Sequence, residues 1–204
     1  MASFITADLH LGEDRMGLMS RPFVDGDECM AHMIKEHNAL VKPEDSVIIA
    51  GDLCYQKRLD MLPMIAKFNG HKTLIRGNHD RGLSDADLAP YFEVVVPEGD
   101  GIVIESVDGI RCFATHYPTC GKVDCFNLVG HIHSAWKVQK NMLNVGVDVH
   151  HFRPVNLDRI IFHFNAICQY YDEDVWVAYA SVNQHWHGFR GKKGTYFTKH
   201  KEQL

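Results

Sequence analysis

Short apolar runs that alternate with helix-like stretches constrain the fold of this chain more than any other feature. Residues 3–7, 46–50 and 72–76 are rich in β-branched and other apolar side chains, which is typical of buried strands. Between these runs, residues from Asp25 onward and residues 58–68 carry apolar side chains at helical spacing. Strands and helices that alternate in this way predict right-handed crossovers and a mostly parallel sheet.

Closely spaced strand-like runs dominate the sequence from residue 93 onward. Asp108 and Gly109 form a hairpin turn signal between two of them. The runs lie at residues 93–96, 101–107, 110–115, 126–129, 136–139 and 142–147, and a helix is expected over residues 156–164. This half of the chain therefore predicts a second sheet that is more antiparallel than the first.

The overall composition limits the class of protein. A chain of 204 residues, of which 46% are hydrophobic, suits one globular domain with a sizeable core. The net charge of -5 gives no general attraction to nucleic acid. The six cysteines form no Cys-x-x-Cys pair, no apolar run reaches membrane-spanning length, and no secretory signal precedes the first strand. We therefore expect a cytoplasmic protein with reduced thiols, and the 14 histidines suggest metal binding.

Polar residues that are common metal ligands follow several of the predicted strands directly. Residues two apart on an extended chain point the same way, so the two polar residues of a segment such as 8–10 can face one point. The ends of strands are also where open α/β sheets hold their ligands. The strand-end residues are Asp8, His10, Asp52, Asn78, His79, His116, His131 and His133.

The chemistry of this set favours metal ions. Carboxylates, imidazoles and one amide oxygen suit Mn²⁺, Fe or Zn²⁺, and thiolates are absent from the set. The set is too large for one ordinary transition-metal site. Its size fits two metals that share a bridging carboxylate, the usual device for displacement at phosphorus.

Five blocks of the sequence resemble the calcineurin-like metallophosphoesterase superfamily, in the order of that family. The blocks are Asp8-Leu9-His10, Gly51-Asp52, Gly77-Asn78-His79-Asp80, His116-Tyr117-Pro118 and Gly130-His131-Ile132-His133. The resemblance implies an α/β fold in which two packed mixed sheets are flanked by helices in four layers. Residues 21–23, and residues 144–148 with 153–154, resemble a small bacterial and phage branch of the superfamily.

The resemblance also implies a role for each residue. One metal would be held by Asp8, His10 and His133, the other by Asn78, His116 and His131, and Asp52 would bridge them. A metal-bridging hydroxide would attack phosphorus, and His79 would protonate the leaving oxygen or stabilise its charge. Mn²⁺ is the metal that we expect first, with Fe, Zn²⁺ or Ni²⁺ as alternatives.

The chain departs from several branches of the family at Tyr55. Those branches carry an aspartate at this position, which orients the catalytic histidine. Either another carboxylate takes over this role, with Asp80 as the candidate, or His79 is less strongly polarised. Tyr55 itself, and Arg21 in the loop after the first ligand pair, are candidates for contacts with substrate.

The sequence thus predicts a metal-dependent phosphoester hydrolase, a phosphodiesterase rather than a monoesterase, with a small phosphoester or nucleotide as substrate. A nuclease of the same superfamily is the alternative. The net charge argues against it, and the basic, aromatic residues 185–204 argue for it. A binding protein that keeps the metals only as a scaffold is a rival of another class. No oligomeric state is indicated.

The whole chain, residues 1–204, is expected to form one calcineurin-like domain with residues 170–204 as a C-terminal extension. The protein is expected in the cytoplasm, or in the host cytoplasm if a phage encodes it.

Overall fold

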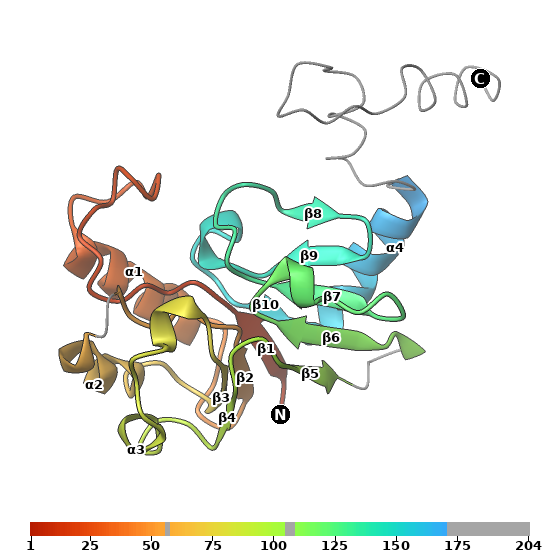
Figure 1. Cartoon of the computed structure of the whole chain (residues 1–204). Coiled ribbons are helices and arrows are strands. Elements are labelled where there is room, and N and C mark those ends of the chain that lie inside the picture. The colour runs from red at the N-terminus through yellow and green to blue at the C-terminus, as the bar shows by residue number, and fades with distance from the viewer. Residues whose placement is uncertain (56–57, 105–108, 171–204) are drawn as a thin grey trace, which may run out of the picture.

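A computed structural model describes residues 1–55, 58–104 and 109–170 of the chain, and it contains two five-stranded sheets that pack face to face (Figure 1). The expected C-terminal extension lies outside the described residues from residue 171 onward. Both sheets are mixed, so the expected fold class is confirmed.

The first sheet is mostly parallel, as the alternation of strands and helices predicts. In spatial order it contains β10 (Val155–Asn156), β1 (Ser3–Thr6), β2 (Ser46–Ile49), β3 (His71–Ile75) and β4 (Val94–Val96). Strands β1 to β4 run parallel, and β10 pairs antiparallel with β1. The sequence placed Asn156 in a helix, but its backbone pairs with β1, and helical structure begins only after it.

The second sheet is more antiparallel than the first, as expected, although its central strands are parallel. In spatial order it contains β5 (Gly101–Ile104), β6 (Cys112–Thr115), β7 (Phe126–Val129), β9 (Met142–Asn144) and β8 (Val138–Gln139). The two edge pairs are antiparallel, but β6, β7 and β9 are parallel. The chain crosses from β6 to β7 through a loop with only a short 3₁₀ turn, Pro118–Cys120. Without a helical crossover, the sequence offers no periodic signal for parallel pairing.

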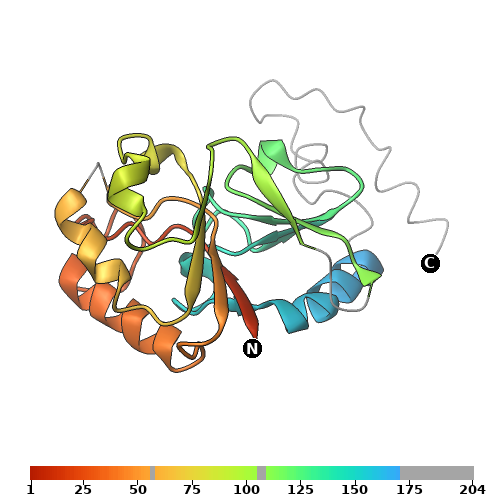
Figure 2. The ribbon, with the colours of Figure 1, turned by 90° about the horizontal axis from the view of Figure 1, so that it is seen from below.

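Helices α1 (Gly26–Asn38), α2 (Leu62–Ile65) and α3 (Asp85–Leu88) cover the outer face of the first sheet, as both views show (Figure 2). Helix α4 (Ile160–Tyr170) packs against the second sheet on the side that faces the first sheet, and its Ile160 and Ile167 belong to the core between the sheets. Asp25 caps α1 by accepting a hydrogen bond from the Glu28 backbone N–H, and Ser84 caps α3. The stretch predicted as a helix over residues 58–68 is only a 3₁₀ turn, Leu59–Met61, followed by the short α2.

Side chains on the two faces of the first sheet belong to two different hydrophobic cores. Val47 and Leu74 pack outward against α1, α2 and α3. Ile5 and Ile75 point the other way, where they meet Leu128 of the second sheet. Because both faces of the first sheet are buried, its strands read as continuous apolar runs. In the part of the chain that the structure describes, no helix has the length and apolar character needed to span a bilayer.

The parallel strands of both sheets end at one edge of the molecule. Just beyond this edge, Ala7 and Gly146 form a parallel bridge between the segments that follow β1 and β9. The Val147 backbone N–H donates to the Ala7 carbonyl at 3.1 Å. The loops that follow β1, β2, β3, β6 and β7 therefore lie together at this shared edge.

Candidate metal centre

The seven residues predicted as metal ligands come from both sheets, and hydrogen bonds and close contacts link them at this shared edge. Asp8 and His10 follow β1, Asp52 follows β2, Asn78 opens the 3₁₀ turn Asn78–Asp80 after β3, His116 follows β6, and His131 and His133 follow β7.

Ligand-type atoms of these residues fall into close groups. In the first group, formed by Asp8, His10 and His133, one ligand atom of each residue lies within 4.8 Å of the other two. The same holds for the second group, which is formed by Asp52, His116 and His131. Asp52 connects them, because its Oδ2 lies 3.4 Å from His10 Nε2 and 3.5 Å from His116 Nε2. The amide oxygen of Asn78, Oδ1, lies 3.2 Å from His116 Nε2, which adds Asn78 to the second group.

Five of these seven residues have left-handed backbone conformations. They are Asp8 (φ 60°), His10 (φ 50°), Asp52 (φ 57°), His131 (φ 74°) and His133 (φ 47°). A positive φ is uncommon outside glycine, and each such residue costs roughly 1–3 kcal/mol unless its surroundings enforce it. Backbone hydrogen bonds do so here: the Asp8 N–H donates to Gly51 O at 3.0 Å, and the His10 N–H donates to Asp52 O at 3.0 Å. Backbone strain that is concentrated in one set of residues is typical of a functional site.

His10 is the clearest sign that the site fits a cation. Its ring is only 4% exposed, and neither ring nitrogen has a hydrogen-bond partner among the described residues. The 3.4 Å contact of its Nε2 with Asp52 is close enough for an ion pair but lacks hydrogen-bond geometry. A buried polar group without a partner is costly, and a metal ion bound to an imidazole nitrogen removes that cost.

The charges of the site also favour a bound cation. Burial raises the pKa of Asp8 to about 7, and the negative charges of Asp52 and Asp148 add to this effect. Burial also opposes ionisation of Asp52, but interactions with His10, His116 and the His79 backbone N–H outweigh it and lower the Asp52 pKa to about 2. A cation beside Asp8 would lower its pKa and keep it ionised at neutral pH.

Hydrogen bonds of Nδ1 orient two of the histidines so that Nε2 faces the other ligands. Burial lowers the pKa of His116, so it is neutral at pH 7, and its Nδ1 lies 2.8 Å from the Ala50 carbonyl. His133 Nδ1 lies 2.7 Å from Asp148 Oδ2. In each case Nδ1 is the donor, which leaves Nε2 to bind a metal. The sequence does not single out Asp148 for this role, although residues 144–148 form another strand end with two polar residues, Asn144 and Asp148.

His79 lies beside both groups. Its ring packs edge-on against the His10 ring with centroids 4.7 Å apart, and its backbone N–H donates to Asp52 Oδ1 at 2.9 Å. One of its ring nitrogens also lies within 4.8 Å of ligand atoms of His10 and Asp52. The position suits a residue that faces a substrate bound at the metals, and it is also within reach of a metal itself.

Asp80 does not take over the orientation of His79, contrary to one of the two expectations. Its Oδ2 accepts hydrogen bonds from the backbone N–H groups of Asp52 and Gly77, and its Oδ1 accepts from Leu53. Both oxygens are thus used to hold the loops after β2 and β3 together. Sequence position alone could not separate these two roles of a carboxylate adjacent to the histidine.

The two residues predicted to contact substrate lie in different environments. Tyr55 is near His79, with ring centroids 5.8 Å apart, and it lies beneath the guanidinium of Arg15. Arg21 instead lies behind the ligands: its side chain is 1% exposed and donates to Asp148 and to main-chain carbonyls. Arg21 is therefore not available to a substrate phosphate, because the loop that carries it folds inward.

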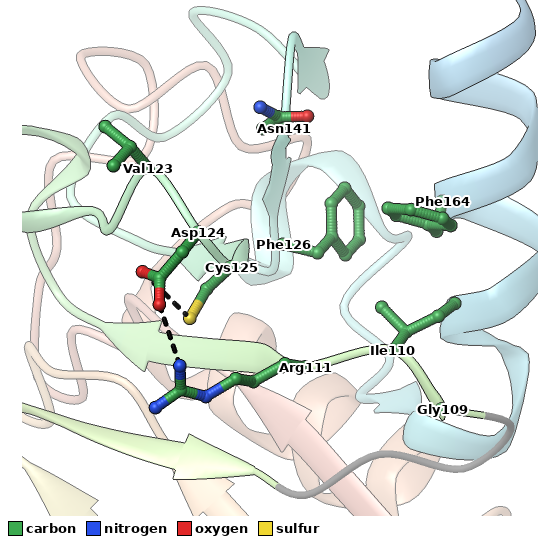
Figure 3. A pocket seen from close by; sticks show the side chains of 9 residues that line it. All are labelled: Gly109, Ile110, Arg111, Val123, Asp124, Cys125, Phe126, Asn141 and Phe164. Carbon is green, nitrogen blue, oxygen red and sulfur yellow. Dashed lines mark hydrogen bonds and ion pairs between the residues drawn. The ribbon is translucent and has the colours of Figure 1, made fainter.

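A cavity of about 430 Å³ lies away from these residues, between the second sheet and α4 (Figure 3). Its lining includes an ion pair between Arg111 and Asp124, at 2.7 Å, and the rings of Phe126 and Phe164, which meet edge to face. None of the candidate ligands lines it. The candidate site is thus defined by its side chains and not by this cavity.

Comparisons with known proteins identify relatives without assigning a function. No family model matches the chain. An uncharacterized protein of Methanocaldococcus jannaschii is 25% identical over 171 residues, which cover 78% of this chain and 88% of that protein. A protein of unknown function from Aquifex aeolicus has a similar structure, with a TM-score of 0.61 and 19% identity over 79% of this chain and 98% of its own. This similarity supports the fold.

Two more distant solved structures carry functional titles. One is an archaeal phosphodiesterase, with a TM-score of 0.42 and 18% identity over 72% of this chain and 82% of its own. The other is a phosphopantetheinyl hydrolase from Mycobacterium tuberculosis, with a TM-score of 0.30 and 14% identity over 57% and 42% of the two chains. Similarity at this level carries no argument about chemistry, so the function has to be argued from the site itself.

Proposed function

We propose that this protein is a dinuclear-metal phosphoester hydrolase that cleaves phosphodiesters in preference to monoesters. The observation that carries the proposal is the pair of ligand groups joined by Asp52, whose Oδ2 lies within 3.5 Å of a histidine from each group. A carboxylate shared by two cations about 3.5–4 Å apart is the usual arrangement for displacement at phosphorus. The substrate class would be a small phosphoester or a nucleotide.

Each residue has a distinct task in this scheme. The residues that would hold the two cations are Asp8, His10 and His133 for one, Asn78, His116 and His131 for the other, and Asp52 for both. When bound, such cations activate water and neutralise charge that develops on phosphate oxygens. His79 lies at the edge of both groups, where its ring can donate a proton to the leaving oxygen. Buried Leu9 and Leu53 keep water away from the back of the site.

The charged residues near the candidate metal site suit a diester better than a monoester. Arg15, which lies over Tyr55, is paired with Glu13 at 2.8 Å. Arg81 is paired with Glu98 at 2.6 Å. These two arginines are already neutralised, so they add little positive charge to that of the cations for a dianionic monoester. A diester carries one negative charge and needs less compensation.

Hydrolysis of generic aryl phosphates tests the proposal. The protein is stripped with a chelator, and bis(p-nitrophenyl) phosphate and p-nitrophenyl phosphate are compared with and without added Mn²⁺. We expect activity that depends on Mn²⁺, is higher on the diester, and is lost together with bound metal in Asp52→Asn. Bound metal without hydrolysis of these esters or of nucleic-acid ends would favour a scaffold, and cleavage of nucleic acid alone would favour a nuclease.

A further inference from the structure

Arg21 and Asp148 form a buried ion pair that joins two distant segments of the chain. Arg21 Nε donates to Asp148 Oδ1 at 2.7 Å, and its Nη2 donates to Asp148 Oδ2 at 3.2 Å. The two side chains are 1% and 4% exposed. One residue precedes α1 and the other lies in the 3₁₀ turn Val147–Val149 after β9, so the pair connects the two halves of the fold.

The remaining donors of Arg21 hold the main chain of the first ligand segment. Nη2 donates to the Asp8 carbonyl at 2.7 Å, and Nη1 donates to the Leu9 carbonyl at 2.9 Å. Asp8 is one of the strained residues, with a φ of 60°. Two short hydrogen bonds from one rigid guanidinium restrain this segment at the point where the Asp8 side chain enters the site.

At the other end of the pair, Asp148 holds a ligand side chain. Its Oδ2 accepts a hydrogen bond from His133 Nδ1 at 2.7 Å, and this hydrogen bond raises the pKa of His133 despite its burial. A carboxylate behind a histidine fixes the ring and makes the free nitrogen a stronger ligand. A continuous chain of contacts thus runs from the Asp8 backbone through Arg21 and Asp148 to the His133 ring.

We propose that Arg21 and Asp148 are positioning residues that set the metal affinity of the first group, formed by Asp8, His10 and His133. This inference rests on the proposed function, since it needs a metal to be bound there. The effect is selective for this group. In the second group His116 is oriented by the neutral Ala50 carbonyl, and neither Arg21 nor Asp148 is among the hydrogen-bond partners that the described residues give His116.

Titration of the stripped protein with Mn²⁺ alone tests the proposal without reference to catalysis. The wild type is expected to bind two ions. Asp148→Asn, which weakens the acceptor for both His133 and Arg21, is expected to raise one dissociation constant about 10–100-fold. The same loss is expected in a His131→Ala background, in which the second group is incomplete. This background assigns the weakened site to the first group.

Asp45→Asn is the matched control. Asp45 is also buried, at 5% exposure, and accepts hydrogen bonds from the Ala2 and Lys42 backbone N–H groups, but it lies before β2, at the opposite end from the ligands. We expect this variant to lose thermal stability and to keep its Mn²⁺ affinity. If Asp148 had only a structural role, Asp148→Asn would behave like Asp45→Asn and lose stability without losing Mn²⁺ affinity. Unchanged Mn²⁺ affinity in folded Asp148→Asn therefore overturns the proposal.

Arg21→Lys keeps the test decisive if Asp148→Asn does not fold. A lysine preserves the charge beside Asp148, but one ammonium group cannot hold Asp148, Asp8 and Leu9 together in the geometry of a guanidinium. Weaker Mn²⁺ binding at the first group is expected, and unchanged binding overturns the proposal. If the wild type binds Mn²⁺ but hydrolyses no phosphoester, only the proposed function fails. If the wild type itself binds no Mn²⁺, both fail.

Discussion

Gly77 lies so close to Asp52 that any side chain on Gly77 would displace the Asp52 carboxylate. A Cβ atom at position 77 would stand 2.3 Å from Asp52 Oδ1 and 2.8 Å from His116 Cε1. The φ of Gly77 is -100°, so a side chain is excluded by space and not by backbone strain. The loop after β3 therefore approaches the shared carboxylate as closely as a backbone can.

The variant Gly77→Ala is expected to lose metal binding and hydrolysis together, because Asp52 would have to move away from both groups. Gly17→Ala is the matched control, since a Cβ there would meet nothing within 4 Å. Metal content by elemental analysis and thermal melting of both variants check the expectation. A folded Gly77→Ala protein with full metal content would show that Asp52 is not needed where the structure places it.

Asp80 is expected to matter for stability and for the shape of the site. Its oxygens accept three backbone hydrogen bonds, from Asp52, Leu53 and Gly77, at 2.8–2.9 Å. In Asp80→Asn an amide N–H₂ would face at least one of these N–H donors, which leaves a buried donor without an acceptor. We expect a loss of roughly 1–3 kcal/mol in the free energy of unfolding, measured in urea.

Asp87→Asn is the control for this change, because Asp87 also accepts a hydrogen bond from a backbone N–H, that of Ser84, but this hydrogen bond is exposed to solvent. Its loss should be clearly smaller, since water replaces the missing partner. Equal losses in the two variants would contradict the role given to Asp80.

The predicted ligands could be found from the sequence because strand ends mark them. Segments such as 8–10 and 131–133 place polar residues two apart directly after an apolar run. Parallel strands then bring such segments to one edge, which makes their proximity a consequence of topology. The same logic predicts the first sheet, because apolar residues at helical spacing separate its strand-like runs in the sequence.

Features that depend on contacts between distant segments could not be predicted in this way. The partner of Arg21 is 127 residues away, so the sequence alone predicts a substrate contact for this loop arginine, although the structure buries it. The left-handed backbone of residues such as His131 has no signal in the sequence, because it is imposed by the packing of two sheets. The parallel pairing of β6 with β7 was missed because the loop between them contains no helix.

His37 is expected to make the fold sensitive to mild acid. It is 3% exposed near the end of α1, and its Nε2 lies 3.0 Å from the Asn69 carbonyl. Burial lowers its pKa from 6.5 to about 4. Below pH 6.5 the unfolded chain therefore binds a proton that the folded chain does not bind until about pH 4. The contribution of His37 is complete above pH 6.5 and is lost as the pH falls toward 4.

The variant His37→Gln checks this expectation, because glutamine can donate to Asn69 but does not titrate. In chelator, we compare the urea unfolding of both proteins from pH 7.5 to pH 4.5. The wild type should lose up to about 3 kcal/mol more than the variant over this range. Parallel pH profiles for the two proteins would contradict the assignment.

The last prediction separates the two roles open to His79, a group that acts on substrate or an additional metal ligand. If His79 donates a proton to the leaving oxygen, His79→Ala should keep its full metal content and lose roughly 10²–10⁴-fold in kcat. Diesters with a nitrophenolate leaving group should suffer less than alkyl diesters, because a stable leaving anion needs no proton. His71→Ala is the control, since His71 is an exposed histidine at the opposite end of β3. Loss of metal in His79→Ala, with equal effects on both kinds of ester, would instead place His79 among the ligands, as its closeness to His10 and Asp52 also permits.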